Sequence, residues 1–255
     1  MTDRTETTNG DSSLKTTRSM RNLLDNGYVA ITTAGLAAGL AAIVVLPSFD
    51  AIIAALLVYC IFATFLLILA RRAGVLQLFG GANFITSVRA AFACVLVGAL
   101  IAAPATVGSW GLPCLVAVAL ILDGLDGYVA RRLGTTSSFG HHFDREVDAA
   151  LVLILTVLLW LSGKIGIWIF AAGLMRYLLL GAGLIWPAMA QHLPESRLRS
   201  VVCGVLIGAL LLCLTPIVDG VLAIAVAGAA LSALTLSFAK DLIWLLRNAT
   251  GKEVK

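Results

Sequence analysis

Long apolar runs separated by short polar segments dominate the chain from about residue 28 onward. Most runs have about 20 residues, the length that an α-helix needs to cross the roughly 30 Å hydrocarbon core of a bilayer. The pattern therefore predicts an all-α fold, a polytopic transmembrane helix bundle of about eight spans. The predicted spans are Tyr28–Leu46, Ala51–Ala70, Phe84–Ala103, Leu112–Arg131, Phe139–Leu161, Ile165–Met189, Val201–Ile217 and Val221–Leu246.

The polar segments suggest how the chain is divided. Its first 26 residues are rich in Thr, Ser and mixed charge and hold too little apolar surface to fold alone. We expect a disordered cytoplasmic tail over 1–26, two extra transmembrane helices over 27–72 and an interfacial linker or helix over 73–82. A six-helix core would follow over 83–247, with a cytoplasmic tail over 248–255.

Basic residues gather at one set of span ends, and the opposite loops hold Lys164 as their one basic residue. Under the positive-inside rule this asymmetry places both termini in the cytoplasm, in agreement with an even number of spans. We expect a multi-pass protein of the cytoplasmic membrane. The basic span ends carry Lys15, Arg18, Arg21, Arg71, Arg72, Arg131, Arg132, Arg197, Arg199, Arg247, Lys252 and Lys255.

Composition narrows the class of protein further. Of the 255 residues, 60% are hydrophobic and 13% charged, whereas a soluble domain has about 45–50% and about 25%. These values exclude a soluble globule, a disordered chain and a disulfide scaffold. The five cysteines stand singly in apolar runs and are interpreted as packing residues. The net charge of +4 reflects the basic span ends, and no nucleic-acid partner is expected.

Four aspartates interrupt the apolar pattern near the predicted cytoplasmic ends of the fourth and fifth spans. Asp123 and Asp126 are three residues apart, and Asp144 and Asp148 are four apart, so each pair shares a helix face. The short connection contains Gly134 followed by hydroxyl residues, which favours a helical hairpin. Two antiparallel neighbours would direct all four carboxylates into one small volume.

Four clustered carboxylates need positive charge, because like charges and desolvation both disfavour the ionised form. An all-oxygen set of ligands suits Mg²⁺, Mn²⁺ or Ca²⁺ and not zinc. Four carboxylates can hold two ions, and paired ions are a common arrangement for in-line displacement at phosphorus. The motif therefore predicts a divalent metal site that faces the cytoplasm.

The neighbouring residue types fit a diphosphate-containing substrate. Gly127 would let a phosphate or ribose approach the helix backbone. Ala130 lies one turn after Asp126 on the same helix face, and its small side chain keeps that face narrow. Arg131 can reach back to a phosphate oxygen with its planar guanidinium. On the facing helix, Gly140 stands one turn before Asp144.

Together these residues resemble the signature of the CDP-alcohol phosphotransferase family at every position and spacing. Eight fixed positions would match by chance somewhere in the chain with a probability of roughly 10⁻⁷ at average residue usage. The resemblance covers six spans, about Phe84 to Leu246, and a weaker pattern includes Asn83, Thr86 and Arg89. The eight positions are Asp123, Asp126, Gly127, Ala130, Arg131, Gly140, Asp144 and Asp148.

The resemblance implies transfer of a phosphatidyl-type group from a CDP-linked lipid, such as CDP-diacylglycerol, to a small hydroxyl acceptor with release of CMP. It implies Mg²⁺ or Mn²⁺ as cofactor, with two ions expected, and Asp148 as general base and fourth ligand. The metal ligands would be Asp123, Asp126, Asp144 and Asp148. The residues expected to bind CDP or phosphate are Gly127, Ala130, Arg131, Gly140, Asn83 and Thr86.

Three further arginines are candidates for binding the acceptor. Arg176 lies within the sixth predicted span, where it would bind an acceptor phosphate or pair with a carboxylate. Arg197 and Arg199 lie before the seventh predicted span and either bind an acceptor or reflect the positive-inside rule. Arg145 and Ala149 depart from relatives that use glycerol phosphate or inositol phosphate. The acceptor, phosphorylated or not, therefore stays open.

Two other classes of function compete with the enzyme. A cation transporter would spread its charges through the membrane, whereas these carboxylates lie at one end of the spans. A non-catalytic lipid-binding relative would be expected to lack one of the aspartates, and none is missing. The many glycines and alanines suit close helix packing in lipid, and the resemblance implies a homodimer.

Overall fold

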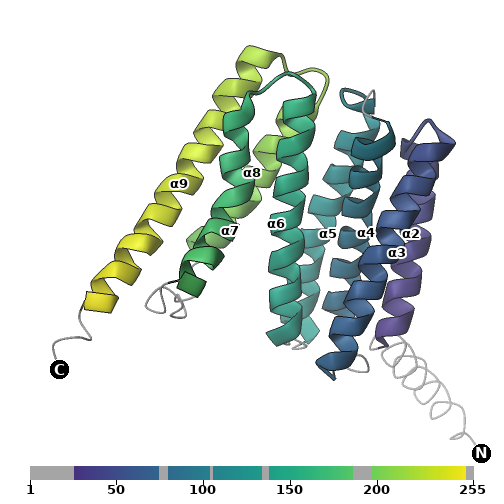
Figure 1. Ribbon diagram of the computed structural model, residues 1–255, viewed down its shortest axis with the longest axis horizontal. Helices are drawn as coiled ribbons and strands as arrows, with labels where there is room; N and C mark the ends of the chain where they lie inside the picture. The colour runs from purple at the N-terminus through teal and green to yellow at the C-terminus, as the bar shows by residue number, and fades with distance from the viewer. Residues whose placement is uncertain (1–25, 75–79, 104–105, 134–137, 186–196, 251–255) are drawn as a thin grey trace, which may run out of the picture. The chain divides into compact units, whose positions relative to one another are not determined.

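The computed structural model describes residues 26–74, 80–103, 106–133, 138–185 and 197–250, and all regular structure in these ranges is helical. Eight α-helices and one 3₁₀ turn follow each other along the described chain (Figure 1). The elements are α2 (Gly27–Val45), α3 (Phe49–Arg72), α4 (Gly80–Ala102), α5 (Gly111–Leu133), α6 (Ser138–Leu161), η2 (Ile167–Ile169), α7 (Phe170–Ile185), α8 (Arg197–Leu214) and α9 (Gly220–Thr250).

Each predicted span corresponds to one of these α-helices, so the prediction of an all-α membrane helix bundle is confirmed. The helix ends differ from the predicted ones by a few residues. The sixth predicted span begins with the η2 turn, because Gly163 adopts a positive φ of 71° and Gly166 is extended just before η2. The predicted tail over 1–26 lies outside the described residues apart from Asn26.

Helix starts are set by local side-chain caps at several points. The Asn26 side chain accepts a hydrogen bond from the backbone N–H of Tyr28, and the Ser48 hydroxyl accepts one from that of Ala51. Asp219 caps the start of α9 in the same way, accepting from Leu222. Each cap satisfies a backbone donor that the first helical turn leaves without a partner.

The exposure of apolar side chains shows what surrounds the protein. Within the described residues, α2, α3, residues 83–102 of α4 and residues 220–240 of α9 are long and apolar enough to cross a membrane. Large apolar side chains on two of these helices are strongly exposed, including Leu36 (70%), Val44 (83%) and Ile61 (71%). Such surfaces are unfavourable in water and favourable against lipid. The chain is an integral membrane protein.

The chain divides into two compact units. The first comprises residues 1–102 and 121–147, and the second comprises residues 103–120 and 148–255. Because α5 and α6 are continuous helices, each contributes one part to the first unit and one to the second. The described part of the first unit contains the early helices α2, α3 and α4.

Small residues bring the first three helices close together. Both α2 and α3 pack along α4, and they also pack against each other (Figure 1). The buried face of α2 consists of Gly27 and four alanines spaced four residues apart. Gly98 of α4 lies so near Ala55 of α3 that an added Cβ would stand 2.5 Å from the Ala55 Cα. The hydroxyl of Tyr59 donates to the backbone oxygen of Ile31 and ties α3 to α2.

In the second unit, α8 and α9 pack against each other, and Gly173 of α7 lies close to Leu153 of α6. The ammonium group of Lys164 donates to the backbone oxygens of Cys213 and Thr215, at 3.2 and 2.5 Å. These carbonyls lie at the end of α8, where the helix leaves acceptors without intrahelical donors. A cation also interacts favourably with that end of the helix dipole.

We expect Gly98→Ala to destabilise the protein, because its new Cβ would collide with the backbone of Ala55. Overpacking of this kind costs about 1–3 kcal/mol. The midpoint of thermal unfolding in detergent should fall relative to the unaltered protein. Gly228→Ala in α9 is the matched control, since no heavy atom lies within 4 Å of its added Cβ. Equal midpoints for the two variants would contradict the close α3–α4 contact.

Candidate active site

One buried arginine joins two of the predicted aspartates. The Nη1 atom of Arg89, on α4, lies 2.7 Å from Oδ1 of Asp123 on α5 and 2.7 Å from Oδ1 of Asp144 on α6. The Arg89 side chain is 1% exposed, whereas both aspartate side chains are 33% exposed. A single guanidinium thus connects three helices of the first unit, and the two carboxylates keep an accessible side.

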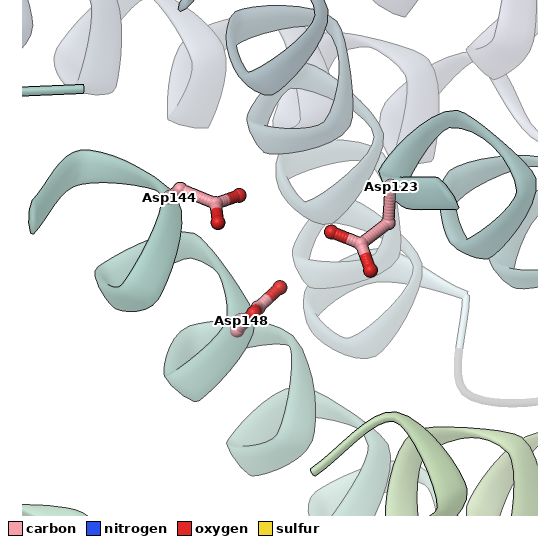
Figure 2. Close-up of side chains that lie close together, drawn as sticks. All are labelled: Asp123, Asp144 and Asp148. Carbon is pink, nitrogen blue, oxygen red and sulfur yellow. The ribbon is translucent and has the colours of Figure 1, made fainter. Parts of the chain in front are cut away.

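A third carboxylate belongs to the same group. Asp148 lies one helical turn after Asp144 on the continuous helix α6, so both side chains project on the same side. One carboxylate oxygen from each of Asp123, Asp144 and Asp148 lies within 4.8 Å of the others. Figure 2 shows Asp123 on one helix facing Asp144 and Asp148 on the other. The predicted convergence of carboxylates from two helices is therefore present for these three residues.

This triad has the chemistry of a hard-cation site. Its donors are all carboxylate oxygens, which Mg²⁺ and Mn²⁺ prefer over nitrogen or sulfur. All three residues are intermediate in exposure, so none of the three carboxylates is fully buried. Three ionised carboxylates beside one guanidinium carry a net charge of about −2 when all are ionised, which matches one divalent cation. The residues therefore fit a divalent metal ion.

Arg89 belongs to a buried polar stripe on α4. Asn83, Thr86 and Arg89 are spaced three residues apart and are 4%, 1% and 1% exposed. Ser87, also buried, donates its hydroxyl hydrogen to the backbone oxygen of Asn83. Buried polar side chains are favourable only when they are satisfied within the protein. Asn83 and Thr86, two of the residues predicted to bind CDP or phosphate, thus lie on the same helix as Arg89.

The other signature residues are placed by their backbone. Gly140 lies on α6 one turn before Asp144. Asp126, Gly127, Ala130 and Arg131 lie in the last turns of α5, but their side chains are outside the part of the chain that the structure describes. Residues 134–137, in which Gly134 was predicted to end one helix and the hydroxyl residues to cap the next, lie outside the described residues. The fourth carboxylate thus stays a prediction at this site.

The predicted acceptor-binding arginines lie on other helices. Arg176 is in α7, and its side chain is not among those described. Arg197 and Arg199, expected before the seventh predicted span, lie in the first turn of α8, which begins at Arg197 and so starts before that span. Their side chains also lie outside the described set, and their part in acceptor binding stays a prediction.

The sequence pointed to Arg89 only as part of a weaker pattern and assigned it no role. Its signal was an arginine inside an otherwise apolar run, where a charge is expensive unless it is paired. The spacing within one helix cannot identify the partners, because Asp123 and Asp144 are more than 30 residues away in sequence. Only the tertiary structure, which places Arg89 of α4 beside Asp123 of α5 and Asp144 of α6, brings them together.

We expect Arg89→Met to lower the stability of the metal-free protein, because Asp123 and Asp144 lose their shared counter-charge. Removing one partner of a buried ion pair costs about 3 kcal/mol. Addition of Mg²⁺ or Mn²⁺ should then raise the unfolding midpoint of Arg89→Met more than that of the unaltered protein, since the cation replaces the lost charge. Arg72→Met, at an exposed position, is the control. A smaller metal-induced rise in Arg89→Met would contradict this account.

Comparison with known proteins identifies the family to which this site belongs. A search of curated proteins and a search of solved structures gave no match. The family described as CDP-alcohol phosphatidyltransferase matches residues 79–237, more than half of the chain. The matched range contains α4, α5 and α6 with the buried arginine and the three clustered aspartates. The chain therefore belongs to the CDP-alcohol phosphatidyltransferase family, whose members transfer phosphate-linked groups from CDP-alcohols in lipid synthesis.

Proposed function

We propose that this protein transfers a phosphatidyl-type group from a CDP-linked lipid, CDP-diacylglycerol in the first instance, to a small hydroxyl acceptor and releases CMP. The observation that carries the proposal is the triad Asp123, Asp144 and Asp148 inside the family-matched range. Family membership supports a CDP-alcohol donor, an alcohol acceptor and association with a membrane. The identity of the lipid and of the acceptor is the finer part of the proposal.

The proposed metal ligands are Asp123, Asp126, Asp144 and Asp148. The carboxylate oxygens described for three of them support this assignment, and four carboxylates would accommodate two Mg²⁺ or Mn²⁺ ions. Bound there, the ions would neutralise phosphoryl oxygens and favour in-line attack at phosphorus. Family membership supports a divalent cofactor, since the family is generally metal dependent.

The remaining signature residues are proposed to hold the CDP part of the substrate. Gly127 and Gly140 lack a Cβ and so allow a phosphate or ribose to approach a helix closely. Arg131 would donate two hydrogen bonds from its planar guanidinium to diphosphate oxygens. Ala130, Asn83 and Thr86 would complete the cytidine and phosphate pocket. Asn83 and Thr86 stand on α4, the helix that also carries Arg89.

Asp148 is proposed as the general base. A carboxylate oxygen of Asp148 would accept the proton of the acceptor hydroxyl as that oxygen attacks the phosphorus bonded to the CMP leaving group. The new phosphorus–oxygen bond forms as the bond to CMP breaks, so one displacement suffices. The position of Asp148, one turn further into α6 than Asp144, supports this role because an acceptor can lie beyond the other ligands.

The acceptor is proposed to be a small alcohol or an alcohol phosphate, such as glycerol phosphate or inositol phosphate. Arg176, Arg197 and Arg199 are the proposed contacts for an acceptor phosphate. Their guanidinium groups suit phosphate oxygens, and a basic residue inside a membrane helix is expected to have a function. If the acceptor is unphosphorylated, these arginines would instead pair with carboxylates or with the membrane surface.

We place the site at the cytoplasmic face of the cell membrane, with both termini in the cytoplasm. The distribution of Lys and Arg at the predicted span ends supports this orientation. A cytoplasmic site would give water-soluble acceptors direct access, while the lipid part of the donor stays in the bilayer. A homodimer is proposed from family resemblance alone.

The decisive assay measures CMP release by the purified protein from labelled CDP-diacylglycerol, with Mg²⁺ or Mn²⁺ and a panel of acceptors. We expect release that depends on one acceptor and stops when EDTA removes the metal. Metal binding without CMP release for any acceptor would favour a non-catalytic lipid-binding protein. Cation flux into proteoliposomes, again without CMP release, would favour a transporter.

We expect Asp148→Asn to lower kcat by a factor of about 10²–10⁴, the usual contribution of a general base. The amide keeps the size of the side chain but cannot accept the hydroxyl proton. Glu146→Gln is the matched control, because it removes an exposed carboxylate from the same helix turn and should leave kcat close to that of the unaltered protein. Near-normal turnover by Asp148→Asn with unchanged metal affinity would rule out the assigned base.

A further inference from the structure

The α2–α3 pair precedes the family-matched range of residues 79–237, yet α2 and α3 pack against α4, and α3 also contacts α6 through a ring stack. Both helices lie along α4, the helix of Arg89, within the first unit (Figure 1). The close approach of Gly98 to Ala55 shows that α3 and α4 meet with almost no space between their backbones. The extra helices are therefore part of the structure around the site.

An aromatic column connects α3 to the start of α6. The ring of Phe62 on α3 stacks on that of Phe143 on α6, with centroids 6.5 Å apart and an angle of 18° between the ring planes. Phe143 in turn stacks on Phe139, one turn earlier, at 6.1 Å and 23°. Phe143 directly precedes Asp144 in the sequence. The contact from α3 thus falls on the turn of α6 that carries a triad member.

A wider apolar cluster surrounds this column. It includes Phe84 of α4, which follows the buried Asn83 in the sequence. The cluster therefore joins side chains of α2, α3, α4 and α6. Its buried members are Ala30, Leu66 and Ala70, and the partly buried side chains packed on them are Ile31, Phe62, Leu67, Phe84, Phe139 and Phe143.

Helix geometry explains why this contact matters for the aspartates. Phe139 and Phe143 are four residues apart and share one face of α6, while Asp144 and Asp148 share the face about 100° further round the helix. A helix that rotates about its axis moves both faces together. Fixing the two aromatic rings against α3 therefore fixes the direction in which the two carboxylates project.

We propose that Phe62 is a positioning residue and that the α2–α3 hairpin is the support that holds α6 in its site-forming rotation. Phe62 packs against Phe143, and this contact presents Asp144 and Asp148 to Asp123 and Arg89. The inference rests on the proposed metal-dependent transfer and adds to it a part for the two helices outside the family-matched range. Close-packed apolar contacts suit such a role, because they resist small displacements.

The test compares Phe62→Ala with Phe65→Ala. Phe65 lies on the same helix but is 63% exposed, so its loss removes an equal ring from the lipid-facing side. Manganese affinity is measured in detergent by electron paramagnetic resonance, well below the unfolding midpoint of each variant. We expect Phe62→Ala to weaken Mn²⁺ binding and kcat for CMP release roughly tenfold, because displacements near 1 Å can cost up to about a hundredfold.

A conservative change separates positioning from general stability. Phe62→Tyr keeps the ring that stacks on Phe143 and should restore both Mn²⁺ affinity and kcat to within about threefold of the unaltered protein. If Phe62→Ala does not fold, Phe62→Leu replaces it with the same expectation, since leucine keeps most of the apolar volume but lacks a ring. Phe65→Ala should bind Mn²⁺ and release CMP like the unaltered protein.

The outcomes distinguish this inference from the proposed function. Equal Mn²⁺ affinity and kcat for a folded Phe62→Ala or Phe62→Leu and for Phe65→Ala would overturn the positioning role while the transferase stands. If the unaltered protein binds Mn²⁺ but releases no CMP with any acceptor, the proposed function fails. The Mn²⁺ affinities alone then decide the role of Phe62. An unaltered protein that binds no Mn²⁺ overturns both.

Discussion

The contact of the Arg89 guanidinium with Asp123 and Asp144 is the interaction on which the site depends. Two carboxylates from different helices repel each other, and their approach in a partly buried place is unfavourable without positive charge. Arg89 supplies that charge from a third helix at 2.7 Å from each. The arginine side chain is buried and the two carboxylates are partly accessible, so the ion pairs leave part of each carboxylate exposed.

The apolar packing around this contact comes largely from small residues. Alanines on α2 and the Gly98–Ala55 approach bring three helices near each other, as close packing in lipid requires when no hydrophobic effect drives helices together. Aromatic rings then fill the space where α3 meets α6. Helix α4 thus belongs to both the apolar packing and the polar site. Its alanines and Gly98 pack against neighbouring helices, and its Arg89 contacts the aspartates.

Much of the fold followed from the sequence because the signals were local. A run of about 20 apolar residues predicts a membrane helix wherever it occurs, and eight runs matched eight helices in the described residues. The start of the sixth predicted span was less predictable, because the η2 turn depends on the conformations of Gly163 and Gly166. Helix α8 begins at Arg197, before the predicted span, because a helix can extend beyond the apolar run that defines a span.

The sequence by itself determined the membrane class, the helical pattern and the carboxylate pairs, since each depends on neighbours within one or two turns. It also carried the family signature from Asp123 to Asp148. Only the tertiary structure decided which charge faces those carboxylates and what supports α6. Arg89 and Phe62 are far in sequence from the residues they contact. The periodicity of a helix shows which of its residues share a face, but it cannot show which other helix meets that face.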